Sequence, residues 1–164
     1  MKTLLAIQPE SRHVGFAVFE GNKLIDWGGK DLPRISVLEH GSRETLALFR
    51  SLVERHSPDI VVLPPPATLP ENLRSKFVRA VREESVQRLH DIADFSNDDV
   101  SQCFRTLCNL ERINKETIRQ VLVKWFPELR SCLPNPRRLW KRQDHWVPMF
   151  DAVALAVTWL YHHE

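Results

Sequence analysis

Apolar and polar positions alternate along the first part of the chain in a way that predicts three short β-strands. Residues 3–7 form a compact apolar run, and residues 13–19 alternate with period two around Val14, Phe16 and Val18. A third strand-like segment covers residues 24–27. Polar turns separate the three segments, so the pattern predicts a three-stranded antiparallel meander.

The middle of the chain predicts a helical crossover into a buried parallel strand. Ser42 is a candidate N-cap for a helix that ends near His56, because apolar residues recur at helical spacing in the segment that follows it. Residues 60–63 (IVVL) form a β-branched run typical of a parallel strand, and the prolines at 64–66 end it. A strand, a helix and a parallel strand predict a sheet covered on both faces.

The second half of the chain reads as mostly helical. A helix is predicted from Glu71 to about Glu84, whereas residues 86–92 fit either a strand or a continuation of that helix. Residues 96–99 match the capping-box pattern S-x-x-D ahead of a helix that carries Val100, Phe104 and Leu107.

Two more helices complete the pattern. The first has apolar residues at positions 118, 121, 122 and 125, and Pro127 marks its end. Residues 134–148 read as irregular. The last helix, residues 149–161, is apolar around most of its circumference and should be largely buried.

Length and composition indicate one α/β domain that spans residues 1–164. With 164 residues, 43% of them hydrophobic, the chain can bury a core of its own. No apolar stretch reaches the roughly 20 residues of a membrane-spanning helix, so we expect a cytoplasmic protein without membrane contact. The three cysteines lack paired metal-ligand spacing and are expected to be buried free thiols.

The net charge of +2 conceals an uneven distribution. Residues 83–99 contain six acidic residues and one basic residue, whereas residues 103–143 contain ten basic and three acidic residues. Such a basic stretch is typical of a polyanion-binding surface, because cations that neutralise phosphates release condensed counterions. A solvated helix face would have the same composition, so both interpretations stay open.

Two passages of the sequence carry a resemblance to a known family. The segment Ile7-Gln8-Pro9-Glu10-Ser11-Arg12-His13-Val14-Gly15-Phe16-Ala17-Val18 resembles the opening I-D-P-G-S-x-x-x-G-x-x-V of the RuvC-type Holliday-junction resolvases. The segment Asp151-Ala152-Val153-Ala154-Leu155-Ala156 is similar to their closing D-A-x-A-x-A helix. The resemblance implies an RNase H-like fold with a mixed five-stranded sheet, formed by the meander and the parallel strands and flanked by helices.

The resemblance also implies a nuclease site, which is incomplete here. The family uses about four carboxylates, or three with a histidine, to hold two divalent ions about 4 Å apart. Here Gln8 replaces the first aspartate, Leu63-Pro64 stand at the place of a glutamate, and Pro148 stands at the place of an acid or histidine. Asp151 alone matches. A neutral amide competes poorly with water for Mg²⁺.

Other residues compensate for the missing acids only if they converge on Asp151. Glu10 lies two residues beyond Gln8, and Asp144 and His145 precede the last helix. A rebuilt site from Glu10, Asp151 and one of Asp144 or His145 would hold Mg²⁺ or Mn²⁺. The alternatives are ordinary surface residues and, for Asp151, a place at a helix N-terminus that the helix dipole favours.

Further cations are candidates for contact with nucleic acid. Residues 137–142 interleave basic side chains with one aromatic ring, which suits phosphate contact and base stacking, or else form a surface loop with the ring packed in the core. The candidates are Arg137, Arg138, Trp140, Lys141 and Arg142. Arg12 is expected to face the same cleft as Gln8.

Three functions therefore remain open from the sequence. The leading hypothesis is a RuvC-like domain that is catalytically weakened or inactive and binds branched or single-stranded nucleic acid. The second is an active metal-dependent, structure-selective endonuclease with relocated acids. The third is a structural or partner-binding domain. Because junctions present two symmetric cleavage points, the resemblance also makes a homodimer a hypothesis to test.

Overall fold

The computed structural model describes residues 1–10, 12–32, 38–65, 73–133 and 146–163, and a five-stranded sheet lies at its centre. The first strands, β1 (Thr3–Pro9), β2 (His13–Glu20) and β3 (Lys23–Asp31), form the predicted antiparallel meander. Strands β4 (Ile60–Leu63) and β5 (Asp91–Asp94) run parallel to β1, in the order β3-β2-β1-β4-β5. The predicted mixed α/β sheet is confirmed.

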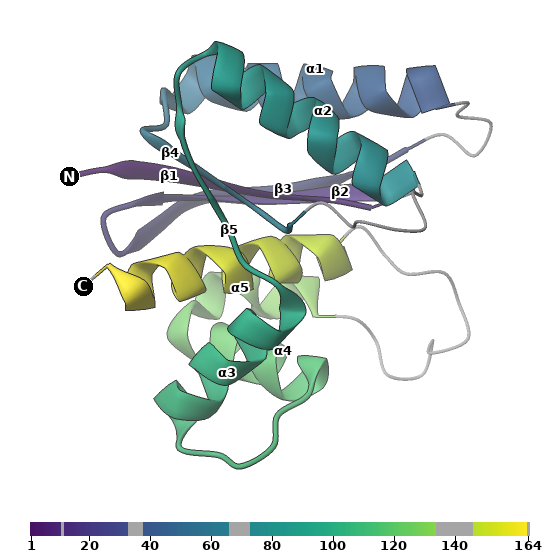
Figure 1. The fold of residues 1–164 in the computed structure, drawn as a ribbon. Helices are drawn as coiled ribbons and strands as arrows, with labels where there is room; N and C mark the ends of the chain where they lie inside the picture. The colour runs from purple at the N-terminus through teal and green to yellow at the C-terminus, as the bar shows by residue number, and fades with distance from the viewer. Residues whose placement is uncertain (11, 33–37, 66–72, 134–145, 164) are drawn as a thin grey trace.

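Helices cover both faces of this sheet, as the crossover pattern predicts (Figure 1). On one face lie α1 (Leu38–His56) and α2 (Leu73–Gln87). On the other face lies α5 (Trp146–His162), and beyond it pack α3 (Asn97–Cys108) and α4 (Lys115–Trp125), followed by the short 3-10 helix η1 (Pro127–Cys132).

The side-chain alternation of β1 divides the hydrophobic core into two parts. Leu4 and Ala6 pack into the cluster beneath α5, whereas Leu5 and Ile7 pack into the cluster beneath α1 and α2. All four are at most 1% exposed. Because successive strand residues point to opposite faces, Gln8 shares the α5 face with Leu4 and Ala6.

Several predicted boundaries are wrong, and each has a local reason. β3 continues to Asp31, beyond the predicted end at Trp27, because β2 pairs with it through Gly28 and Gly29. The ring of Phe16 covers Gly28 where a side chain would otherwise lie. Helix α1 begins at Leu38, ahead of the predicted cap at Ser42, because no proline interrupts residues 38–42.

The ambiguous residues 86–92 divide between the two alternatives. Helix α2 continues to Gln87, a turn follows in which Leu89 has a positive φ of 62°, and β5 begins at Asp91. Since Glu71 lies outside the described residues, the predicted start of this helix stays a prediction.

The C-terminal part also departs from the predicted pattern. Helix α5 begins at Trp146, so the prediction of an irregular segment is wrong for residues 146–148. Pro148 fits because the first turn of a helix leaves its amide positions without intrahelical partners. Leu107 and Trp125 are each 41% exposed, so they lie at the edge of their helices' apolar faces. Trp125 stacks on Phe104 with a centroid distance of 5.9 Å.

An ion pair joins the two helices on the α1 face. Arg50 of α1 donates from Nε to Glu84 Oε2 at 2.7 Å and from Nη2 to Glu84 Oε1 at 2.6 Å. These hydrogen bonds lower the pKa of Glu84 below its ordinary value of 4.5. The pair therefore stabilises the contact between α1 and α2 when Glu84 is ionised.

The prediction of buried free thiols is confirmed for two of the three cysteines. All three are free thiols, with Cys103 and Cys132 buried and Cys108 half-buried. Burial raises the pKa of the Cys103 thiol, which keeps it in its unreactive protonated form. Among the described residues, none of the helices is long and apolar enough to span a bilayer.

Candidate functional site

The site forms where the parallel strands end. Gln8 lies near the end of β1 and is only 4% exposed, and Pro64 directly follows β4. Ligands of open α/β sheets bind at the carboxyl ends of parallel strands, so this edge is the expected location. Helix α5 comes close because Gly15, the partner of Gln8 on β2, has no side chain and touches the backbone of Pro148 and Met149.

Gln8 acts as a hydrogen-bond donor towards the acid beside it. Its Nε2 donates to Oε1 of Glu10 at 3.0 Å. The other carboxylate oxygen of Glu10, Oε2, lies 3.3 Å from Nε of Arg74 in an ion pair with α2. This contact is an ion pair without hydrogen-bond geometry. The buried Nε of Arg74 therefore has no hydrogen-bond partner among the described residues. Glu10 is therefore compensated from two sides.

Asp151 is likewise compensated by a cation. Its Oδ2 lies 3.4 Å from Nζ of Lys115, the first residue of α4. Because α5 begins at Trp146, Asp151 lies in the second turn, and the interpretation of Asp151 as an N-terminal dipole partner is wrong. Among the described residues, Lys115 is a hydrogen-bond partner of Asp151.

Gln8 and Asp151 line a cavity of about 540 Å³. Of the residues that the structure describes, three cations, Arg74, Lys115 and Arg119, line it together with two carboxylates, Asp98 and Asp151. The remaining polar and apolar lining comes from the ends of β1, β4 and β5 and from α3, α4 and α5. These residues are Gln8, Pro64, Pro65, Phe95, Ser96, Asn97, Val100, Ser101, Ile118, Phe150, Ala154 and Leu155.

Two capped helix starts bring α3 and α4 to this cavity. The predicted capping box is confirmed: Asp99 donates its backbone N–H to Ser96 Oγ at 3.1 Å, and Ser96 donates its own to Asp99 Oδ2 at 2.8 Å. Asn114 caps α4 by accepting the backbone N–H of Thr117 at 2.8 Å. Both helices therefore begin at the cavity.

Arg119 follows Lys115 by one helical turn and lines the cavity beside it. Its side chain is 16% exposed, and Nη1 lies 3.6 Å from Glu116 Oε2. Its buried Nε has no hydrogen-bond partner in the described part of the chain. Two arginines at this site thus carry a buried N–H donor without an acceptor.

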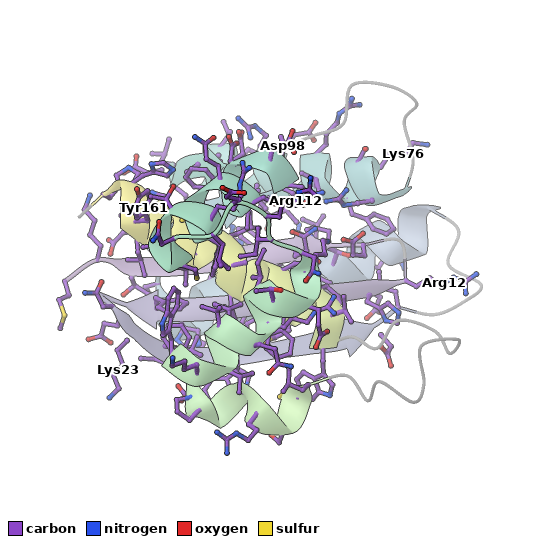
Figure 2. The ribbon with its side chains drawn as sticks, turned by 90° about the horizontal axis from the view of Figure 1, so that it is seen from below. Arg12, Lys23, Lys76, Asp98, Arg112 and Tyr161 are labelled. Atoms are coloured by element: carbon purple, nitrogen blue, oxygen red, sulfur yellow. The ribbon has the colours of Figure 1, made fainter. Side chains whose placement is uncertain are left out.

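The predicted site residues are only partly brought together. Gln8, Glu10 and Asp151 lie at the same end of the sheet. Asp144, His145, Arg137, Arg138, Trp140, Lys141 and Arg142 lie outside the described residues. The prediction for Arg12 is wrong: its side chain is exposed, does not line the cavity, and extends away from the end of the sheet (Figure 2).

None of the three cations is among the predicted site residues. Arg119 had a usable signal, because it lies four residues after Lys115 and therefore on the same helix face. Arg74 had none, because its place depends on how α2 packs across the sheet.

The described residues do not fit two divalent metal ions. Hard cations require several anionic oxygens. Gln8, which stands where the resemblance places the first aspartate, is instead a buried amide that donates its N–H to Glu10. Glu10 and Asp151 are each engaged by a side-chain cation. Within the described ranges, no group of three or more His, Cys, Asp or Glu could hold a metal.

Comparison with solved structures shows the fold. The chain is similar to RuvC of Thermus thermophilus in complex with a Holliday junction substrate, with 17% identity, a TM-score of 0.66, and coverage of 99% of this chain and 95% of that one. The yeast mitochondrial Holliday junction resolvase matches with 14% identity and a TM-score of 0.58, over 96% of this chain and 78% of that one.

A viral enzyme extends the comparison. The Fowlpox virus resolvase, in a complex with Holliday junction DNA, matches with 11% identity and a TM-score of 0.53, over 97% of this chain and 99% of that one. No family model and no curated protein matches the sequence. The chain thus has the RNase H-like fold of the RuvC-type resolvases.

Proposed function

We propose that this chain is a RuvC-like nucleic-acid-binding domain that lacks the two-metal nuclease reaction of its structural relatives. The observation that carries the proposal is the hydrogen bond from the buried Gln8 amide to Glu10, at the position where such a site needs an anion. A carboxylate that already accepts from Gln8 and pairs with Arg74 is a weak ligand for a divalent ion.

Support for nucleic-acid binding comes from the charges around the cavity. Three cations line it, and two of the solved structures with this fold contain Holliday junction DNA. Phosphate neutralisation by side-chain cations supplies most of the affinity of such complexes. The basic residues between 137 and 142 would add to this surface if they lie near the cavity.

The test combines binding and cleavage on one substrate. A labelled four-way DNA junction is titrated with the protein at several salt concentrations, then incubated with Mg²⁺ or Mn²⁺. We expect binding that weakens steeply with salt and no metal-dependent cleavage. Cleavage that Asp151→Asn abolishes would refute the loss of the reaction and favour a rebuilt site with Asp144 or His145. Absence of any binding would favour a partner-binding domain.

Domain organisation, cellular location and oligomeric state are part of the same proposal. We treat residues 1–164 as a single domain, cytoplasmic and able to act as a homodimer on symmetric junctions. Light scattering of the free protein and of its junction complex tests the stoichiometry.

A further inference from the structure

We propose that the cavity binds a phosphodiester group without a divalent metal ion, and that Arg74, Lys115 and Arg119 supply the positive charge that metal ions supply in a two-metal site. This inference rests on the proposed function and names the chemical group that the cavity recognises.

The first step is the balance of charge in the cavity. A two-metal site collects carboxylates and needs the ions to become attractive to a phosphate. Among the described residues, three cations and two carboxylates line the cavity before any ion binds, so the lining carries a net charge of +1. Glu10 and Glu116 each approach one of these cations, at 3.3 Å and 3.6 Å, but neither lines the cavity. Gln8 adds no charge, so the groups that line the cavity favour an anion without divalent ions.

The second step concerns donors that lack acceptors. The Nε atoms of Arg74 and Arg119 are buried, and neither has a hydrogen-bond partner among the described residues. The Glu10 oxygen that lies 3.3 Å from the Arg74 Nε forms an ion pair without hydrogen-bond geometry. A buried donor without an acceptor costs free energy and calls for a missing partner such as a water or an anion. Guanidinium groups match phosphate oxygens in geometry, so a phosphate is a suitable acceptor for both.

The third step is the role of the two acids. Asp151 lies 3.4 Å from Lys115, and Glu10 lies 3.3 Å from Arg74. In a metal site these carboxylates would be ligands, whereas here they face cations. They compete with an incoming phosphate for the same side chains, which makes their removal a sensitive test.

The size of the cavity fits more than one isolated phosphate. Its volume of about 540 Å³ lies within the range of roughly 300–1,000 Å³ that is usual for small-ligand sites. Phe95 and Pro64 supply apolar surface beside the cations. A sugar-phosphate unit of a nucleic acid therefore has both charged and apolar contacts available.

The experiment measures junction binding in EDTA and in millimolar magnesium chloride. We expect binding in EDTA that is at least as tight as in magnesium chloride, because magnesium ions compete with the protein for DNA phosphates. We also expect a loss of roughly ten- to a hundredfold for Lys115→Met or Arg119→Met, because each removes a charge-assisted hydrogen bond. Lys124→Met is the matched control, since Lys124 is exposed on the same helix and does not line the cavity. Binding that needs magnesium, or that Lys124→Met weakens as much as Lys115→Met, would overturn the inference.

Asp151→Asn separates the two kinds of site. In a metal-free site it removes a negative charge and frees Lys115, so affinity in EDTA should rise. A fall in affinity would contradict the inference.

A second probe keeps the inference testable if nucleic acid does not bind. Pyrophosphate is titrated in EDTA while the arginine Nε–Hε signals are followed by NMR. We expect the signals of Arg74 and Arg119 to shift, whereas Arg50, already bonded to Glu84, should not respond. No shift at either cavity arginine would reject the phosphate site. A shift without junction binding would reject only the nucleic-acid partner.

Discussion

Replacing Gln8 with glutamate tests the central hydrogen bond with almost no change of shape. The amide Nε2 that donates to Glu10 becomes a carboxylate oxygen, so a favourable contact becomes a repulsive one in a residue that is 4% exposed. The substitution therefore asks whether this position tolerates an anion when no metal ion is present.

The expected magnitude follows from the geometry. Two unit charges at the 3.0 Å of the present contact repel by about 5 kcal/mol at an effective dielectric constant of about 20. Arg74, 3.3 Å from the far oxygen of Glu10, offsets part of this repulsion. We expect the free energy of unfolding to fall by about 2–4 kcal/mol at neutral pH, and Tm to fall by about 5–15 °C for a domain of this size.

A matched control exists on the surface of α4. Gln120 Nε2 donates to Glu116 Oε1 at 3.1 Å, which is the same pairing in an exposed position. Gln120→Glu should cost less than about 0.5 kcal/mol, because solvent screens the two charges. The difference between the two variants isolates the effect of burial at Gln8.

The assay is urea unfolding of the wild type and both variants, in EDTA and in manganese chloride. Manganese should restore stability to Gln8→Glu, because an ion that binds only the folded state stabilises it by about 2.7 kcal/mol at a hundredfold excess over Kd. The wild type should not respond to manganese. If Gln8→Glu is as stable as the wild type in EDTA, the reasoning about the buried amide is wrong.

Three further predictions concern the framework of the site. Ser96→Ala should lower the free energy of unfolding by about 1 kcal/mol through loss of the capping box of α3, as measured by urea unfolding. Glu84→Gln should destabilise the protein at neutral pH. Because Arg50 lowers the pKa of Glu84, the difference in unfolding free energy between the wild type and this variant should persist above pH 4.5 and shrink as the pH falls further. Urea unfolding at several pH values measures this difference. Gly15→Ala should cost more than about 3 kcal/mol or prevent folding, since the new Cβ would overlap the backbone of Met149; wild-type stability by the same measurement would refute that close approach.

The sheet and its main helices were predictable because their signals are local. The alternation in residues 13–19 and the apolar run at 60–63 report burial directly, and both became strands. Errors arose where tertiary contacts override local signals. The predicted strand ended at Trp27, yet pairing with β2 carries β3 through Gly28 and Gly29.

The candidate site was predictable only where a motif marked it. Gln8 and Asp151 came from the family resemblance and Glu10 from its position two residues beyond Gln8, and the structure places all three at one end of the sheet. Arg74 was invisible because no spacing in the sequence relates α2 to the turn after β1. The pairing of acids with cations depends on side chains far apart in the chain, so residue types alone did not predict it.

The outer strands of the sheet have a consequence for solution behaviour. β5 is only four residues long and has an aspartate at each end, and β3 carries Lys23, Asp26, Lys30 and Asp31. A growing fibril requires a long, uncharged edge strand with which another chain can pair, and neither β3 nor β5 is such a strand. Concentrated samples should therefore resist amyloid-like polymerisation, which makes prolonged titrations and crystallisation practical.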